Sequence, residues 1–237
     1  MAISLVQSRG IIDAPTAGFP IVMSPSFTSL PTVGNLLIVA INVLTGSAVT
    51  FVMVTPSGVT ISKNSGATRA TGIAVFVGVK VCDNPADDQT WDIRCDSISS
   101  APNLCTLLEF SGAGLPIEGT SESGAGSGTS WTTGNIAPTA GVERLLFANL
   151  GQWWNYAITP TGSGWLTAFN HSRFNRSQLT RYQIVNPTSG TYAATATAAG
   201  GDAEWHAWGT AFPASAVAPP SGDGDPGAWL GDYMRIE

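Results

Sequence analysis

The stretch Thr71–Cys82, TGIAVFVGVKVC, carries valine or isoleucine at every second position over most of its length. Side chains two residues apart share one face of a β-strand, so this alternation predicts a half-buried strand with one apolar face. That face consists of Ile73, Val75, Val77, Val79 and Val81. Two shorter stretches, Thr90–Cys95 and Leu104–Phe110, follow along the chain and predict further strands.

The stretch before it, Leu36–Val54, is LLIVAINVLTGSAVTFVMV and contains no charged residue. Its length and hydropathy are those of a membrane-spanning helix. However, Thr45-Gly46-Ser47 interrupts its centre, and β-branched residues dominate both sides. We therefore predict two buried strands, Leu36–Leu44 and Val49–Thr55, joined by a short turn, and no membrane insertion.

The second half of the chain repeats the first in outline. Asn186-Pro187 and Phe212 repeat Asn84-Pro85 and Phe110 at the same spacing, and ERLLFA repeats GNLLIV at a slightly larger one. A Gly/Ser/Thr stretch, Gly119–Thr133, separates the halves and is expected to form a surface loop or an irregular edge segment.

Helix signals are almost absent, and the pattern predicts an all-β protein: a two-sheet antiparallel β-sandwich of the jelly-roll type, built from two Greek keys facing each other. Residues 1–32 are expected to form an extended N-terminal segment and residues 33–213 the sandwich. Residues 214–237 are expected to form a Pro/Gly linker and a flexible C-terminal arm.

The composition narrows the function. Only 11% of the 237 residues are charged, and the net charge is −6. An apolar content of 43% argues against disorder. The nearest approach to a basic cluster is Arg173, Arg176 and Arg181, which is too sparse for a nucleic-acid partner. The first residues do not show the basic stretch followed by an apolar stretch that is typical of a signal peptide. We therefore expect folding in a reducing cytoplasm.

The residues also resemble a known family. GNLLIVAI, a long alternating strand, TLLEFSGA, a Gly/Ser loop, ERLLFA and a last strand ending in WHAWGTAFPA follow one another in this order over residues 33–213. This order resembles the concanavalin-like jelly-roll β-sandwich modules of bacteriophage virion proteins, of the minor tail and capsid-decoration type. The resemblance implies a structural role in the virion and localisation there, after assembly in the host cytoplasm.

The sequence gives little support to a catalytic role. Glu204, His206 and Trp208 share one strand face, which is expected to be a polar stripe on the surface of the sandwich. Glu109 is expected to be partly buried in a structural salt bridge. The cysteines, Cys82, Cys95 and Cys105, are expected to be buried free thiols, with a Cys95–Cys105 disulfide or a metal site as alternatives. We expect neither an enzyme nor a cofactor.

Aromatic residues are the main candidates for binding. Trp153, Trp154, Tyr156 and Trp165 lie close together in sequence, and Trp208 is a further candidate. Adjacent tryptophans in a strand point to opposite faces, so Trp153 and Trp154 cannot both enter the core. Three roles for these aromatic residues are open: contact with another subunit, ordinary packing in the core, and glycan binding.

The C-terminal arm carries a second group of apolar residues after the linker. It docks on a neighbouring subunit or folds back on its own sandwich, through Trp229, Leu230, Tyr233, Met234 and Ile236.

The resemblance, taken with these features, implies a structural protein of a bacteriophage virion, a minor tail protein near the tail tip that acts through subunit interfaces. A capsid decoration or head-fibre protein is the alternative, and a carbohydrate-binding module for host attachment is the second alternative. The expected partners are other virion proteins, further copies of the chain in a homo-oligomer (a trimer) and a cell-wall glycan.

Overall fold

The structure is a computed structural model. It describes residues 2–13, 21–45, 51–64, 72–95, 103–154, 156–173, 176–187, 190–200 and 204–215. The docking residues expected at the C-terminus, Trp229 to Ile236, lie outside these ranges.

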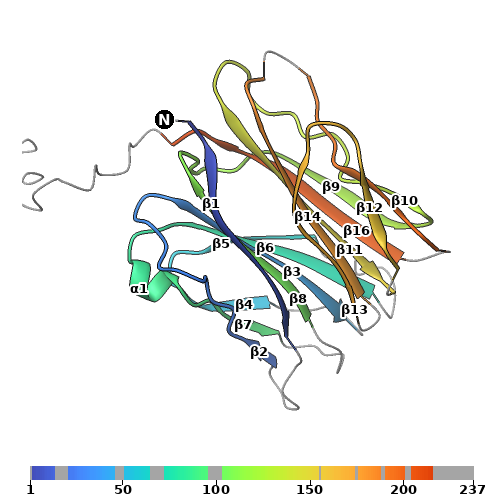
Figure 1. The fold of residues 1–237 in the computed structure, drawn as a ribbon, viewed down its shortest axis with the longest axis horizontal. Coiled ribbons are helices and arrows are strands. Elements are labelled where there is room, and N and C mark those ends of the chain that lie inside the picture. The colour runs from blue at the N-terminus through green and yellow to red at the C-terminus, as the bar shows by residue number, and fades with distance from the viewer. Residues whose placement is uncertain are drawn as a thin grey trace, which may run out of the picture.

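Strands make up nearly all of the regular structure in the described ranges, so the all-β prediction is confirmed (Figure 1). The first half contains β1 (Ser4–Asp13), β2 (Ile21–Met23), β3 (Leu36–Thr45), β4 (Phe51–Thr55), β5 (Thr60–Asn64), β6 (Gly72–Val81), the short helix α1 (Pro85–Asp88), β7 (Asp92–Cys95) and β8 (Asn103–Ser111). The second half contains β9 (Glu118–Ser127), β10 (Ser130–Thr132), β11 (Arg144–Trp153), β12 (Ile158–Thr161), β13 (Leu166–Arg173), β14 (Arg176–Val185), β15 (Thr195–Ala198) and β16 (Glu204–Pro213).

Within the described ranges the strands form four antiparallel sheets, and the second half repeats the strand order of the first. The first half has a five-stranded sheet, β1-β8-β3-β6-β5, and a three-stranded sheet, β2-β7-β4. Adding eight to each number gives the order of the second half, β9-β16-β11-β14-β13 and β10-β15-β12. The predicted repeat is therefore present in the topology. The prediction of two sheets is wrong, because each half contributes a small sheet of its own.

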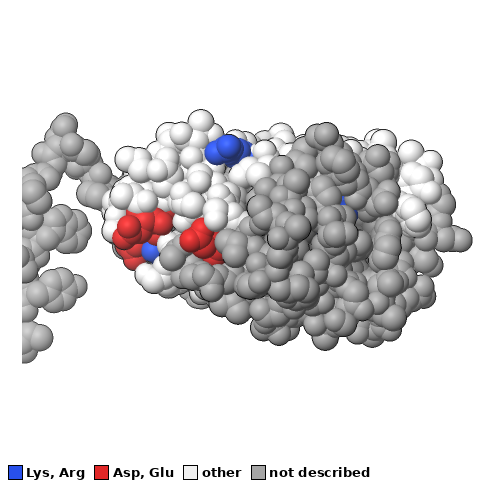
Figure 2. Space-filling view, turned by 90° about the horizontal axis from the view of Figure 1, so that it is seen from below, with Lys and Arg blue, Asp and Glu red and all other residues white. Residues whose placement is uncertain are grey.

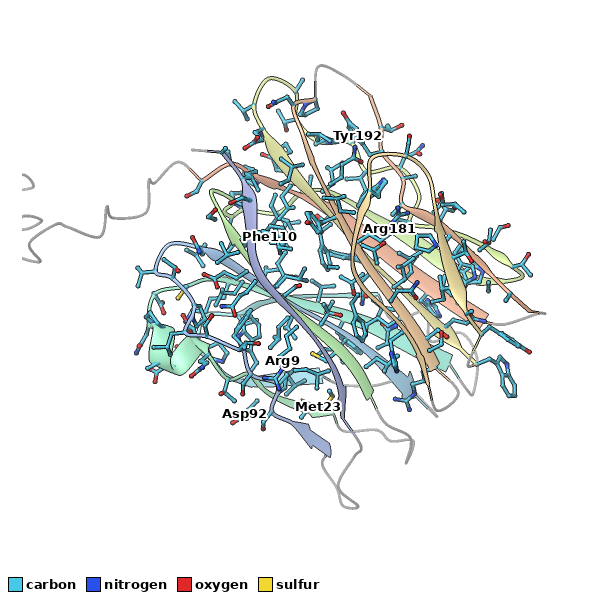
Figure 3. The ribbon with its side chains drawn as sticks, viewed as in Figure 1. Arg9, Met23, Asp92, Phe110, Arg181 and Tyr192 are labelled. Atoms are coloured by element: carbon cyan, nitrogen blue, oxygen red, sulfur yellow. The ribbon has the colours of Figure 1, made fainter. Side chains whose placement is uncertain are left out.

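The sheets stack in four layers. The two five-stranded sheets face each other across a central core that includes Leu36, Val77, Phe110, Leu145 and Phe212. Phe110 is labelled within this layer in Figure 3. Each small sheet covers the outer face of its larger neighbour, through Met23 and Ile93 in the first half and through residues including Trp131 and Ala196 in the second.

Burial on both faces explains the apolar runs in the sequence. Every residue from Leu36 to Ile41 is buried, because β3 lies between the central core and the core beneath its small sheet. β3 and β4 are both strands, as predicted, but they belong to different sheets and do not pair as a hairpin. No helix in the described ranges is long and apolar enough to cross a membrane.

β6 is likewise buried on both faces, which corrects the prediction of a half-buried strand. Val75, Val77 and Val79 point into the central core as expected, and Phe76 on the opposite face packs under the small sheet. The N-terminal residues also belong to the sandwich. β1 pairs with β8 from Ser4 to Asp13, and β2 pairs with β7.

The central layer is apolar at one end and polar toward the other. Asn149 donates to Asn42 Oδ1 at 3.2 Å and accepts from Gln178 Nε2 at 3.0 Å and Thr180 Oγ1 at 3.1 Å. Thr180 also bonds Thr106 across the layer. Because these side chains are buried and come from both large sheets, their hydrogen bonds fix how one sheet sits on the other.

A buried cation joins the outer layer of the second half to its large sheet. Arg181 of β14 donates to the backbone oxygens of Thr161, Thr195 and Trp165, and Figure 3 shows it between these elements. Burial lowers its pKa from the ordinary arginine value. Arg176 is buried as well, so two of the three arginines considered as a basic cluster offer no surface to a nucleic acid.

Candidate binding surfaces

The predicted aromatic group is divided by the fold. Trp208 is 1% exposed and packs against Phe147 in the central core, with ring centroids 6.2 Å apart. Trp165 is 8% exposed and lies in the core beneath the small sheet of the second half. Trp208 lies on the face of β16 that points into the central core, and Trp165, just before β13, packs beneath the small sheet. For these two residues the packing interpretation holds.

Trp154 and Tyr156 are the members that remain at the surface. Their exposed fractions are 47% and 37%. Trp154 follows the end of β11 with φ of 102°, a conformation that costs a non-glycine residue energy and is found mostly where the surroundings enforce it. Ser177 Oγ donates to the backbone oxygens of Trp154 at 3.0 Å and Tyr156 at 2.8 Å. The two rings are thus presented by a turn fixed to β14. The side chain of Trp153 lies outside the described part of the structure.

Next to Trp154 and Tyr156 lies a group of three side chains that the sequence did not bring together. Trp131 of β10 and Trp205 of β16 stack with ring centroids 6.5 Å apart and an interplanar angle of 22°. Gln152 of β11 lies opposite Trp205 in the strand register. Together with Trp154 and Tyr156, these residues define the aromatic end of the second half.

A second surface lies at the opposite end of the strands. Six exposed apolar side chains lie in or beside strand ends on this side: near the start of β1, before β3, after β8, before β11 and at the start of β13. Contacts between backbone segments hold this end together, among them Gly114 N to Pro213 O at 2.9 Å and Gly141 N to Pro187 O at 2.9 Å. We call it the apolar end; its side chains are Val6, Leu30, Val33, Leu115, Val142 and Leu166.

A charged cluster adjoins α1 in the first half. Lys80 Nζ contacts Asp88 Oδ1 at 2.6 Å and Asp83 Oδ1 at 2.7 Å. Burial lowers the pKa of Lys80, but hydrogen bonds to both carboxylates outweigh burial, and the pKa is raised overall. Figure 2 shows acidic side chains gathered at the side of the molecule where α1 lies, next to a largely uncharged described surface.

Cys82 lies in the same region and is a buried thiol. Burial, followed by the negative charge of Asp88, raises its pKa to about 12. Cys105 is a buried thiol as well, whereas the side chain of Cys95 is outside the described part.

Glu109 and His206 both differ from expectation. Glu109 is fully buried and accepts hydrogen bonds from Gln7 Nε2, Thr32 N and Asn35 Nδ2, at 2.5, 2.8 and 2.6 Å. These donors are neutral, so within the described residues the expected salt bridge is wrong. His206 is 1% exposed and faces the central layer with Trp208, so the expected surface stripe is wrong too.

The described residues contain no group of three or more His, Cys, Asp or Glu side chains placed to hold a metal ion. Comparison with known proteins adds no relative: no family model, no curated protein and no solved structure matches this chain.

Proposed function

We propose that this protein is a structural component of a bacteriophage particle, a minor tail protein near the tail tip, and that it works through contacts with other virion proteins. The observation that carries the proposal is the apolar end. Six of the eight large apolar side chains found exposed among the described residues lie there. Exposed apolar groups gathered in one region are typical of protein interfaces.

The nesting of the strands supports the same proposal. In each half the first strand pairs with the eighth, the second with the seventh and the third with the sixth. This nesting is that of a jelly roll, an architecture used by viral capsid proteins and lectins. On this proposal each half is one jelly roll, in place of the single jelly roll expected over residues 33–213. The fifth strand of each half extends the larger sheet, β5 at β6 and β13 at β14.

The low charge of the protein fits this role. Charged residues are depleted in the cores of protein interfaces because their desolvation is costly. With 11% charged residues, the chain can bury surface against several neighbours at little cost. A capsid decoration or head-fibre protein would share these properties and remains the alternative; a homotrimer remains the proposed assembly.

Purified particles test the location directly. An antibody raised against the full chain, used in immunogold electron microscopy, is expected to label the tail tip, and mass spectrometry is expected to find a few copies per particle. Hundreds of copies on the head would favour decoration. Absence of the protein from the particles would refute the proposal.

Two substitutions test the apolar end. Leu30→Lys and Leu166→Lys introduce charge at exposed positions of this end, and they are expected to reduce incorporation into particles without changing the melting temperature. Thr197→Lys, on the exposed face of β15, is the matched control and is expected to incorporate normally.

The C-terminal arm is tested by truncation. Removing residues 219–237 is expected to lower incorporation into particles if Trp229, Leu230 and their neighbours dock on another subunit. Unchanged incorporation would refute that docking.

A further inference from the structure

The aromatic end contains buried polar atoms that the fold does not satisfy. Within the described part of the protein, both Gln152 Oε1 and Gln152 Nε2 are buried without a hydrogen-bond partner, and so are Trp131 Nε1 and Trp205 Nε1. Buried polar groups are nearly always hydrogen-bonded in folded proteins, and unsatisfied ones call for a specific explanation. These four atoms on three neighbouring side chains form no hydrogen bond with any described residue and could take one from a bound group.

The register shows that these side chains face the same space. Along β11, Ala148 and Leu150 point into the core beneath the small sheet, and Gln152 continues the same face at the end of the strand. Trp205 is the cross-strand neighbour of Gln152, and Trp131 stacks on Trp205 from the small sheet. The interior of the second half therefore changes from apolar to polar where it reaches this end.

This end also reaches the surface. Trp205 and Ala198 each retain 8% exposure, although both belong to the core cluster. The exposed rings of Trp154 and Tyr156 lie beside it, since Ser177, which anchors their backbone, is paired with Gln152 in the neighbouring strand. Tyr156 also packs against Gly200, where a Cβ would lie 2.7 Å from Tyr Cε1.

The chemistry of these groups selects a class of ligand. An amide both donates and accepts, an indole N–H donates, and none of the five side chains carries a charge at neutral pH. A sugar ring offers hydroxyls that both donate and accept and C–H faces that stack on aromatic rings. A nucleotide, a phosphate or an acidic peptide would require cationic partners instead.

We propose that the aromatic end binds a neutral carbohydrate. One sugar unit stacks on Trp154 or Tyr156. The Gln152 amide is fully buried in the unbound protein, so a glycan hydroxyl reaches it only when neighbouring side chains move aside on binding. This site goes beyond the proposed structural role, because it gives a virion component direct contact with a glycan at the host surface. The site and the apolar end lie at opposite ends of the strands, so an experiment can refute the glycan-binding proposal without refuting the structural proposal, and the reverse.

Binding of the full chain to a glycan array that includes bacterial cell-wall polysaccharides tests the proposal, with isothermal titration calorimetry on the best ligand. Trp154→Ala and Tyr156→Ala are each expected to weaken binding at least tenfold. Thr139→Ala, an exposed position before β11 that belongs to neither surface, is the control and is expected to leave the affinity unchanged.

Gln152→Leu separates a binding role from a structural one. Leucine removes the unsatisfied amide, so the melting temperature is expected to stay the same or rise while glycan affinity falls. Failure of the wild-type chain to retain any glycan would overturn the proposal, as would binding that all three variants leave unchanged. A change in oligomeric mass caused by the two aromatic substitutions, measured by light scattering without glycan, would overturn it in favour of a subunit contact.

Discussion

Asn149→Ala tests the buried polar network between the two large sheets, in which Asn149 bonds Asn42 of the other sheet and Gln178 and Thr180 of its own. Asn149 makes three buried hydrogen bonds: one to Asn42, one from Gln178 and one from Thr180, at 3.2, 3.0 and 3.1 Å. Each such bond contributes roughly 1 kcal/mol net, so the substitution is expected to lower the free energy of unfolding by about 3 kcal/mol. For a chain of this size, that corresponds to a fall in melting temperature of roughly 6–12 °C.

Urea unfolding followed by circular dichroism measures the free energy, and scanning calorimetry measures the melting temperature. Asn170→Ala is the matched control, because Asn170 is exposed and donates one hydrogen bond, to Ile158 O at 2.9 Å. A loss for Asn149→Ala no larger than that of the control would refute the role assigned to the network. A double-mutant cycle with Asn42→Ala is expected to show a coupling of about 1 kcal/mol, since the two amides contact each other directly.

Four further predictions concern the first half and its junction with the second. Lys80→Met leaves the buried Asp88 carboxylate without its cation and is expected to cost about 3–5 kcal/mol in urea unfolding. In the wild type, the pKa of Lys80 is raised, so the pair stabilises fully below the ordinary lysine pKa and stability falls as the pH rises beyond it; alkaline melting curves check this. With a pKa of about 12, native Cys82 is expected to resist iodoacetamide at pH 8 until urea is added, as mass spectrometry would show. Gly112→Ala is expected to cost at least about 1–3 kcal/mol in thermal unfolding, because its φ is 71° and a Cβ would lie 2.6 Å from the backbone oxygen of Ala2.

The sequence predicted strands well where one physical signal decided them. In β6 the alternating valines specified a strand and its inner face, and Val75, Val77 and Val79 occupy that face. Burial of the other face could not be predicted, because Phe76 is covered by residues of the small sheet that are distant in sequence. The Gly/Ser/Thr stretch gave the weakest signal. Its edge-segment interpretation corresponds to β9, the outermost strand of the second large sheet.

The candidate site was predicted only in part. Trp154 is exposed, but it follows the end of β11, and the side chain of Trp153 is outside the described part, so the argument from adjacent tryptophans stays a prediction. Trp208 was misassigned because strand parity tells which residues share a face, and only the sheet order tells whether that face is covered. Gln152, Trp131 and Trp205 come from three separate strands, so no local pattern brings them together. The hint that the sequence offered was that Trp131 and Trp205 stand among polar residues.

The repeated strand order divides the fold into two eight-strand halves that depend on each other for burial. Among the described residues, each large sheet buries its inner face against the other half, through residues such as Leu36 and Val77 on one side and Leu145 and Phe147 on the other. The chain is thus equivalent to a dimer whose two subunits share one polypeptide. A single eight-strand unit would expose that face in water, and a chain cut between β8 and β9 should reassemble from its two fragments.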